Sequence, residues 1–146
     1  MIKIILYLIL LAAIHAKLEI MIEGKEGWAK SLPCWRLNVF ITKLIIGKEI
    51  TGYHIYLMLM FLLLFHSPFL FLNWTLSGEL FVLGLFCIYW ILEDFMWFIE
   101  NKHYGIKSFK RGKISWHQRW FLGLPVSYLI SLIIGISLLI IGRLNV

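Results

Sequence analysis

Two adjacent carboxylates, Glu93 and Asp94, lie within the stretch 75–100, which is apolar and long enough to cross a lipid bilayer. Ionisable side chains at membrane depth are costly in free energy, so they usually face protein or water and often mark a functional site. Carboxylates in such a place can act as general bases or as ligands of a metal ion. We therefore expect Glu93 and Asp94 to be the catalytic residues of any reaction at this position.

Histidines and one further carboxylate are candidate metal ligands beside this acidic pair. Glu100 and His103 have the Glu-x-x-His spacing with which helical bundles present two ligands, although di-iron bundles use two such pairs and this chain has one. Imidazole and carboxylate groups suit zinc, iron, copper or manganese, and the sequence does not choose among them. The expected cofactor is a transition metal ion, and the expected metal ligands are His54, Glu93, Glu100, His103 and His117.

Each of these residues also has an interpretation without chemistry. Glu93 and Asp94 can pair with Lys or Arg from neighbouring loops and so tie their helix to its neighbours. His54 can extend to water at the membrane interface, and His103 and His117 can be solvated within a basic loop. A chemical site is favoured only if these groups meet on one side of the membrane, and we expect Glu93 or Asp94 to lie within reach of at least two of the three histidines.

The composition indicates a membrane protein with a single domain, residues 1–146. The chain is 61% hydrophobic and 16% aromatic, well above the apolar share of soluble domains. Its net charge of +6 comes from basic residues between apolar stretches, a pattern typical of topology determinants rather than of nucleic-acid binding. Cys34 and Cys87 form no CxxC motif, so neither a disulfide framework nor a thiolate zinc site is expected.

The predicted fold class is an all-α integral membrane protein with four transmembrane helices. These helices are expected at about 2–22, 53–72, 75–99 and 124–142. The first is interpreted as a retained helix and not a cleaved signal peptide, because Ile14 makes a poor cleavage site near Ala16. Apolar residues at helical spacing also predict a short interfacial helix at about 37–46. Pro68 is expected to kink the second span.

The distribution of Lys and Arg predicts the orientation in the membrane. Twelve of the fourteen basic residues lie at or between spans one and two, or between spans three and four. Because basic loops stay in the cytoplasm, loops 23–52 and 100–123 are expected to be cytoplasmic and both termini to be outside. The expected location is the cell membrane or an inner membrane.

Three classes of function remain open at this stage. The first is a metal-dependent membrane enzyme that acts on a lipid-like or quinone-like molecule at the cytoplasmic interface. The second is a non-catalytic accessory subunit, which packs within a larger membrane complex or forms a homo-oligomer. The third is a proton or ion carrier that uses Glu79, His66 and Glu93 at three depths. The lipid bilayer is the expected partner in all three cases, and nucleic acid is not.

Overall fold

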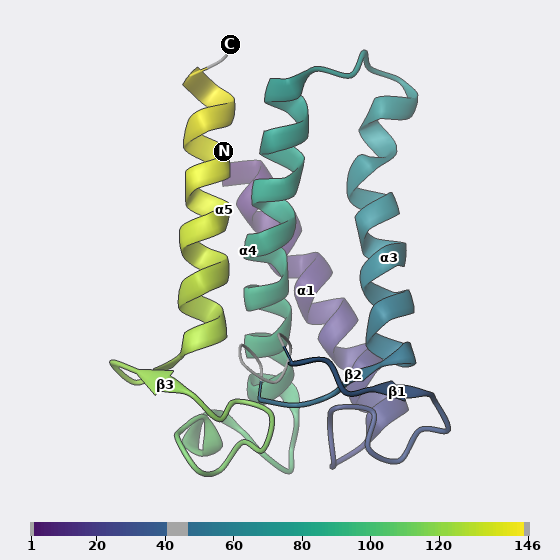
Figure 1. Ribbon diagram of the computed structural model, residues 1–146, viewed down its shortest axis with the longest axis vertical. Helices are drawn as coiled ribbons and strands as arrows, with labels where there is room; N and C mark the ends of the chain where they lie inside the picture. Colours follow the sequence, from purple (N-terminus) through teal and green to yellow (C-terminus); the bar gives the residue numbers. More distant parts are fainter. Residues whose placement is uncertain (1, 41–46, 145–146) are drawn as a thin grey trace.

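The computed structural model describes residues 2–40 and 47–144, which form four long helices (Figure 1). They are α1 (Ile2–Glu23), α3 (Gly52–His66), α4 (Leu76–Glu100) and α5 (Val126–Leu144). All four are long and apolar enough to cross a membrane. For α3, this length includes the 3-10 helix that follows it, Ser67–Leu70. The predicted spans are thus confirmed as apolar helices.

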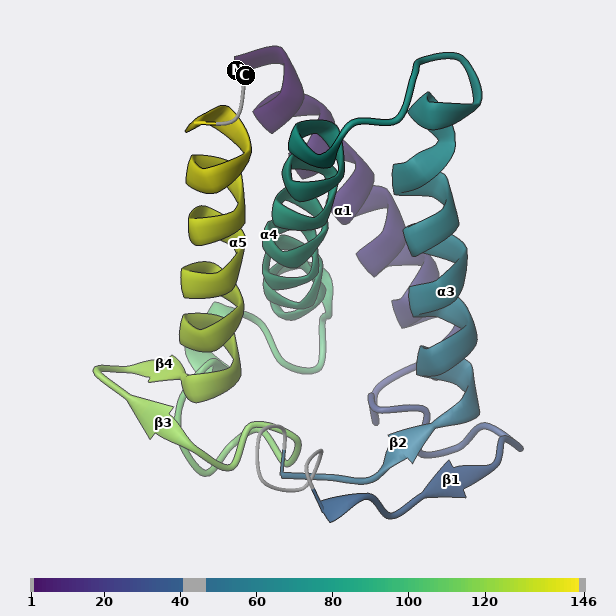
Figure 2. The same cartoon turned by 45° about the horizontal axis from the view of Figure 1, so that its top comes forward.

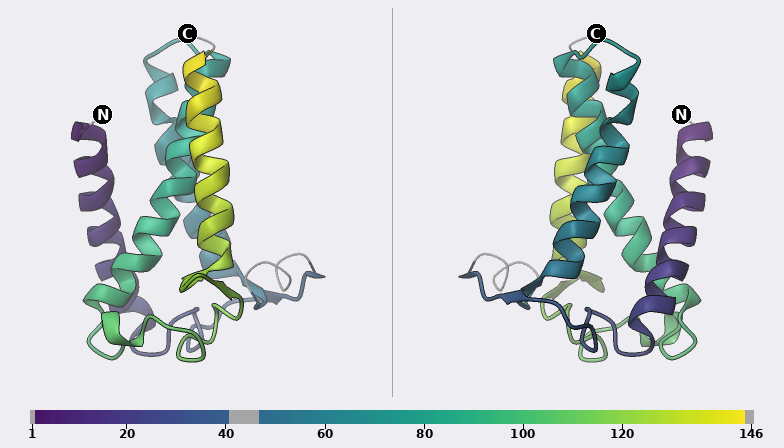
Figure 3. Two further views of the ribbon diagram at one scale, coloured as in Figure 1. Left: turned by 90° about the vertical axis from the view of Figure 1, so that its left-hand side faces the viewer. Right: turned by 90° about the vertical axis from the view of Figure 1, so that its right-hand side faces the viewer.

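Helix α4 lies at the centre of the bundle, with α3 and α5 on either side of it and α1 across its back (Figures 1 and 2). It runs obliquely: one end lies beside α1 and the other beside α5 (Figure 3). The long loops lie at the first end, which we call the loop end. The link between α3 and α4 lies at the other, which we call the hairpin end, and there α1 begins and α5 ends.

Small residues bring α4 and α5 close together. A Cβ atom added at Gly84 would lie 2.9 Å from the carbonyl oxygen of Gly135, and one at Gly135 would lie 3.2 Å from Cβ of Cys87. Such distances leave no room for a larger side chain, so the two backbones are in direct contact. Nearer the hairpin end, the hydroxyl of Ser77 donates a hydrogen bond to the carbonyl of Gly142.

The other helices meet in two buried clusters. In mid-bundle, Leu8 and Ala12 of α1 pack with Phe61 of α3 and Tyr89 of α4. At the loop end, the buried cluster joins α1 and α4 to the loop that follows α4, and it comprises Ala16, Trp97, Phe98, Ile114 and Trp116. The long loop is therefore anchored on the helices by aromatic packing.

Local sequence explains where the central helices begin and end. The side chains of Thr51 and Thr75 cap α3 and α4 by accepting hydrogen bonds from the backbone N–H groups of His54 and Gly78. Helix α3 ends at His66, and the chain continues as the 3-10 helix with Pro68 in its first turn. Pro68 therefore ends the α-helix instead of kinking it, because a proline is tolerated in a first turn but not in a helix interior.

The loop end contains short strands that an all-α prediction did not include. Strand β1 (Arg36–Leu37) pairs with β2 (Ile50–Thr51), and β3 (Trp120–Phe121) pairs with β4 (Leu124–Pro125), both antiparallel. The second pair turns through Leu122 and Gly123, whose φ angles of 49° and 81° suit a tight hairpin. An interfacial helix was predicted at 37–46. Its first residue, Leu37, lies in β1, and residues 41–46 are outside the described part of the chain.

Candidate functional site

A cavity of about 340 Å³ lies near the loop end, and all four helices contribute to its walls. Helix α1 contributes Glu19 and Glu23, α4 contributes Glu93 and Asp94, and α3 contributes His54. His117 from the loop after α4 completes the set of histidines and carboxylates in the described lining. Helices α1 and α4 place their acids on one wall because the two helices are in contact where α4 reaches its loop end (Figure 3).

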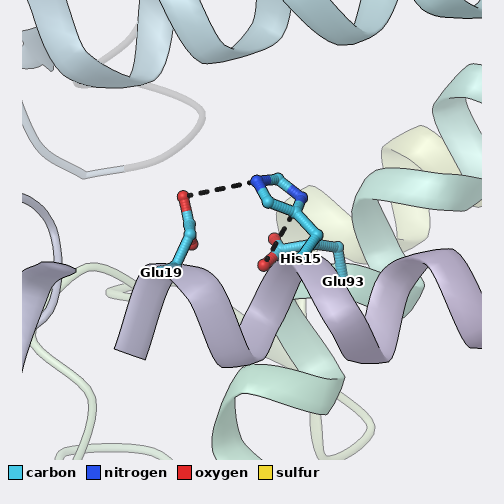
Figure 4. Close-up of side chains that lie close together, drawn as sticks. All are labelled: His15, Glu19 and Glu93. Atoms are coloured by element: carbon cyan, nitrogen blue, oxygen red, sulfur yellow. Dashed lines mark ion pairs between the residues drawn. The ribbon is translucent and has the colours of Figure 1, made fainter. Parts of the chain in front are cut away.

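Beside the cavity, three buried side chains form a cluster with the donor atoms of a metal site. One nitrogen of His15, one oxygen of Glu19 and one oxygen of Glu93 all lie within 4.8 Å of one another. Oε1 of Glu19 lies 3.9 Å from Nε2 of His15, and Oε1 of Glu93 lies 3.9 Å from Nδ1 of the same ring (Figure 4). His15 and Glu19 are one helical turn apart on α1, so both point toward α4.

These donor atoms are buried without hydrogen-bond partners. His15, Glu19 and Glu93 are only 3%, 6% and 3% exposed. No hydrogen bond reaches Nε2 of His15, Oε1 of Glu19 or Oε1 of Glu93 within the described chain. A buried polar atom that lacks a hydrogen-bond partner destabilises the folded protein by about 1–3 kcal/mol, and a charged one by more. This arrangement therefore favours a bound cation.

The spacing of the cluster is compatible with a bound ion. Ligand atoms at about 2.1 Å from one tetrahedral ion lie about 3.4 Å apart. The candidate ligand atoms of the three residues lie within 4.8 Å of one another, so they need to approach by no more than about 1.4 Å around an ion.

Tyr89 sets the orientation of the His15 ring. Its hydroxyl shares a hydrogen bond of 2.8 Å with Nδ1 of His15, and both residues are buried. When Nδ1–H donates to the tyrosine oxygen, Nε2 keeps its lone pair and can bind a metal. Groups that hold the second nitrogen of a metal-binding histidine in this way are a regular feature of metal sites.

Two further contacts in the same cavity join a histidine to a carboxylate. Nε2 of His117 lies 2.8 Å from Oδ2 of Asp94, and that oxygen also accepts a hydrogen bond from the hydroxyl of Tyr128. Nε2 of His54 lies 3.6 Å from Oε1 of Glu23, and its Nδ1 lies 2.6 Å from the hydroxyl of Thr51. Asp94 thus contacts His117, and His54 faces Glu23 instead of the acidic pair.

Within the described residues, no Lys or Arg forms an ion pair with the acids of the cavity. In the described chain, the ion pairs of these residues go to carboxylates elsewhere: Lys17 to Glu100, Lys30 to Glu26 and Arg36 to Glu49. Lys48 lies near the cavity, with its ammonium 5.6 Å from the ring centroid of Trp116 and bonded to Ser115. Partial burial lowers the pKa of Lys48, and the nearby charges of Lys30 and Arg36 lower it further.

The structure brings together some of the predicted site residues and separates others. His54, Glu93, Asp94 and His117 all line the cavity. Glu100 does not; its carboxylate lies 3.3 Å from the ammonium of Lys17. His103 is exposed in the loop, where its backbone N–H donates to the side chain of Asn101. The Glu-x-x-His pair is split because α4 ends at Glu100 and His103 lies beyond it.

Three of the residues at the site were not among those predicted from the sequence. His15, Glu19 and Glu23 follow one another at intervals of four residues on α1. This spacing puts them on one helix face, and it was the signal that could have identified them. They were not selected because a polar helix end at a membrane interface has the same pattern.

The fold and the site define a small helical chain, apolar enough for a membrane, with a buried cluster of histidines and carboxylates at one end. Comparison with family models, curated proteins and solved structures gives no match for this chain.

Proposed function

We propose that this protein is an integral membrane enzyme with a divalent transition metal ion in the cluster of His15, Glu19 and Glu93. The observation that carries the proposal is the buried set of donor atoms without partners, next to a cavity whose acids have no Lys or Arg partner in the described chain. Three protein ligands leave coordination positions free, which is typical of catalytic metal sites and not of structural ones.

The ligand types narrow the choice of metal. One imidazole and two carboxylates suit zinc, iron, manganese or cobalt, and the cluster contains no thiolate. Such an ion polarises a bound oxygen atom and lowers the pKa of bound water. We assign the role of proton donor or acceptor to His117, whose Nε2 is held by Asp94, because a carboxylate that holds one ring nitrogen orients the imidazole.

We further propose that the loop end is cytoplasmic and that the substrate is a lipid-like or quinone-like molecule. The excess of basic residues in the loops supports this orientation. The cavity lies near the end of the apolar helices, where the headgroup of a membrane molecule would be found, and it has an apolar flank. A substrate of this class would bring its polar end to the acids while its chain remains among lipids.

Metal content of the purified protein tests the proposal. We expect about one divalent ion per chain after purification in detergent without chelator, as measured by elemental analysis. Glu93→Gln and Glu19→Gln should each lower metal affinity by at least about tenfold, because a neutral amide is a poor ligand. Glu100→Gln is the matched control on α4, since this carboxylate pairs with Lys17 and should not affect the metal.

Two results would count against the proposal. One is a wild-type protein that stays metal-free after incubation with zinc, manganese, iron or cobalt salts; the interpretation as an accessory subunit would then be favoured. The other is equal metal binding by Glu93→Gln and the wild type. If Glu100→Gln also loses the metal, the ligand set predicted from the sequence is preferred to the cluster proposed here.

A further inference from the structure

We infer that the cavity takes an amphiphile with a cationic headgroup, an amine or a quaternary ammonium, whose apolar chain leaves the protein between α3 and α5. This inference rests on the proposed function only for the reaction that follows binding. The recognition itself depends on the charge, the aromatic lining and the open flank of the cavity.

The charge of the cavity selects against an anionic headgroup. Four carboxylates line the cavity, Glu19, Glu23, Glu93 and Asp94, and no Lys or Arg is among its described lining residues. Phosphate or sulfate at this place would face like charges, whereas a cation would reduce the cost of burying the acids.

The tryptophans of the cavity supply the surfaces that an organic cation prefers. Trp28, Trp90, Trp97 and Trp116 all contribute to the lining. Trp97 and Trp116 are buried and pack edge-to-face at 86°, whereas Trp28 and Trp90 remain partly exposed. Aromatic rings of this kind attract quaternary ammonium groups through cation–π interactions. Lys48 already places its ammonium 5.6 Å from the ring centroid of Trp116.

The apolar side of the cavity provides the path for the chain. Ile55 and Met58 of α3 form one flank, and Ser127 and Ser131 of α5 form the opposite one. Helices α3 and α5 lie on opposite sides of α4 (Figures 1 and 2), and α1 and α4 close the back. Met58 is 41% exposed although it lines the cavity, so this flank opens to the outside of the bundle.

The size of the cavity fits a headgroup and the first part of one chain. A volume of about 340 Å³ lies at the small end of the range for ligand pockets, about 300–1,000 Å³. A complete two-chain lipid would not fit inside. The rest of the chain would therefore stay in the bilayer.

Three amphiphiles with the same chain and different headgroups test the inference. We would add hexadecyltrimethylammonium, hexadecyl sulfate or hexadecyl maltoside, each at the same mole fraction, to the protein in dodecyl maltoside micelles. Thermal unfolding is followed by tryptophan fluorescence, because a ligand that binds only the folded state raises Tm. At saturation we expect the ammonium compound to raise Tm by about 5 °C relative to the other two.

Two methionines on α3 provide a matched pair of variants. Met58→Trp should close the flank and abolish the selective rise in Tm. Met60→Trp should retain it, because Met60 is 52% exposed, does not line the cavity and lies two residues along the same helix. A general detergent effect would be the same in both variants. Equal responses to the three headgroups, or selectivity that survives in Met58→Trp, would overturn the inference.

The design separates this inference from the proposed function. Metal content is measured on the same preparations, and the headgroup series is run with and without chelator. Metal binding without headgroup selectivity refutes only the inference. Headgroup selectivity in a protein that binds no metal supports the inference for recognition and refutes the enzymatic proposal.

Discussion

At the scale of single residues, the site depends on carboxylates buried without the usual compensation. Glu93 is 3% exposed, and the described part of the chain offers it His15 at 3.9 Å but no Lys or Arg. A buried polar group that lacks a partner destabilises the folded state by more than a complete hydrogen bond would stabilise it. A positively charged group would complete the cluster, and for this we propose a metal ion.

Tyr89 provides a test of the cluster that leaves all three proposed ligands in place. Tyr89→Phe removes the hydroxyl that holds Nδ1 of His15, and we expect metal affinity to fall by about tenfold, as for other groups that orient a ligand. Metal titration of the purified variant gives the measurement. Tyr7→Phe is the control, since Tyr7 is 59% exposed on α1. Unchanged affinity in Tyr89→Phe would indicate that Nε2 of His15 is not a ligand.

His15, Glu19 and Glu23 show what the sequence could and could not predict about the site. Their spacing on one helix face is visible in the sequence, but the helix that this face meets is not. Glu100 was predicted at the site from its Glu-x-x-His spacing with His103, and it lies seven residues after Glu93 on α4. The structure places it beyond the cavity, beside Lys17, because seven residues of α-helix extend about 10 Å.

At the scale of elements, the packing of α4 decides where the cavity forms. Gly84 and Gly135 bring α4 and α5 into backbone contact in the bundle, and the obliquity of α4 then separates them toward the loop end (Figure 3). The space that results is bounded by α1, α3 and the loops. The glycine contact between α4 and α5 therefore fixes the geometry of the site, although contact and site lie several helical turns apart.

Gly84→Leu tests this packing. The added side chain would meet the backbone oxygen of Gly135, which cannot rotate away, so the helices must separate. Overpacking of this kind costs about 1–3 kcal/mol, and we expect Tm to fall by about 5 °C. Thermal unfolding in detergent measures the change. Ile133→Leu, at a 65% exposed position of α5, should leave Tm unchanged; an equal loss in both variants would contradict this account.

The elements themselves were largely predictable from sequence because apolar length is a local property. The four apolar helices agree with the predicted spans within a few residues, apart from Pro68, after which 3-10 geometry replaces the expected kink. The strands at the loop end were not predictable, because Leu122 adopts a positive φ without the Asn-Gly signal of a tight hairpin. Short pairs of two residues also carry no alternation that a sequence pattern could reveal.

At the scale of the whole molecule, the loops and the cavity share one end of the bundle. The basic residues that we propose to hold this end in the cytoplasm are concentrated in the loops around the site. The helix ends at the other side carry few charges, and the pair of His66 and Glu79 found there is closed by hydrogen bonds to Leu62 and Trp74. The chemistry proposed here is therefore directed to one face of the membrane.

Cysteine labelling measures this orientation. Cys34 lies in the loop after α1 and is a free thiol, so a membrane-impermeant maleimide should label it only when the cytoplasmic face is accessible. Asn73→Cys in a Cys34→Ser background places the thiol in the link between α3 and α4, and it should be labelled from outside. The opposite result for both thiols would reverse the orientation and move the site to the other face.

X-ray absorption spectroscopy of the metal-loaded protein reports directly on the ligands of the proposed metal. We expect a shell of nitrogen and oxygen atoms at about 2.0–2.2 Å, with the outer-shell scattering of one imidazole and no sulfur at about 2.3 Å. The imidazole signal should disappear in His15→Ala and persist in His103→Ala, whose exposed side chain lies outside the cavity. A sulfur ligand, or an imidazole signal that survives in His15→Ala, would contradict the metal site proposed here.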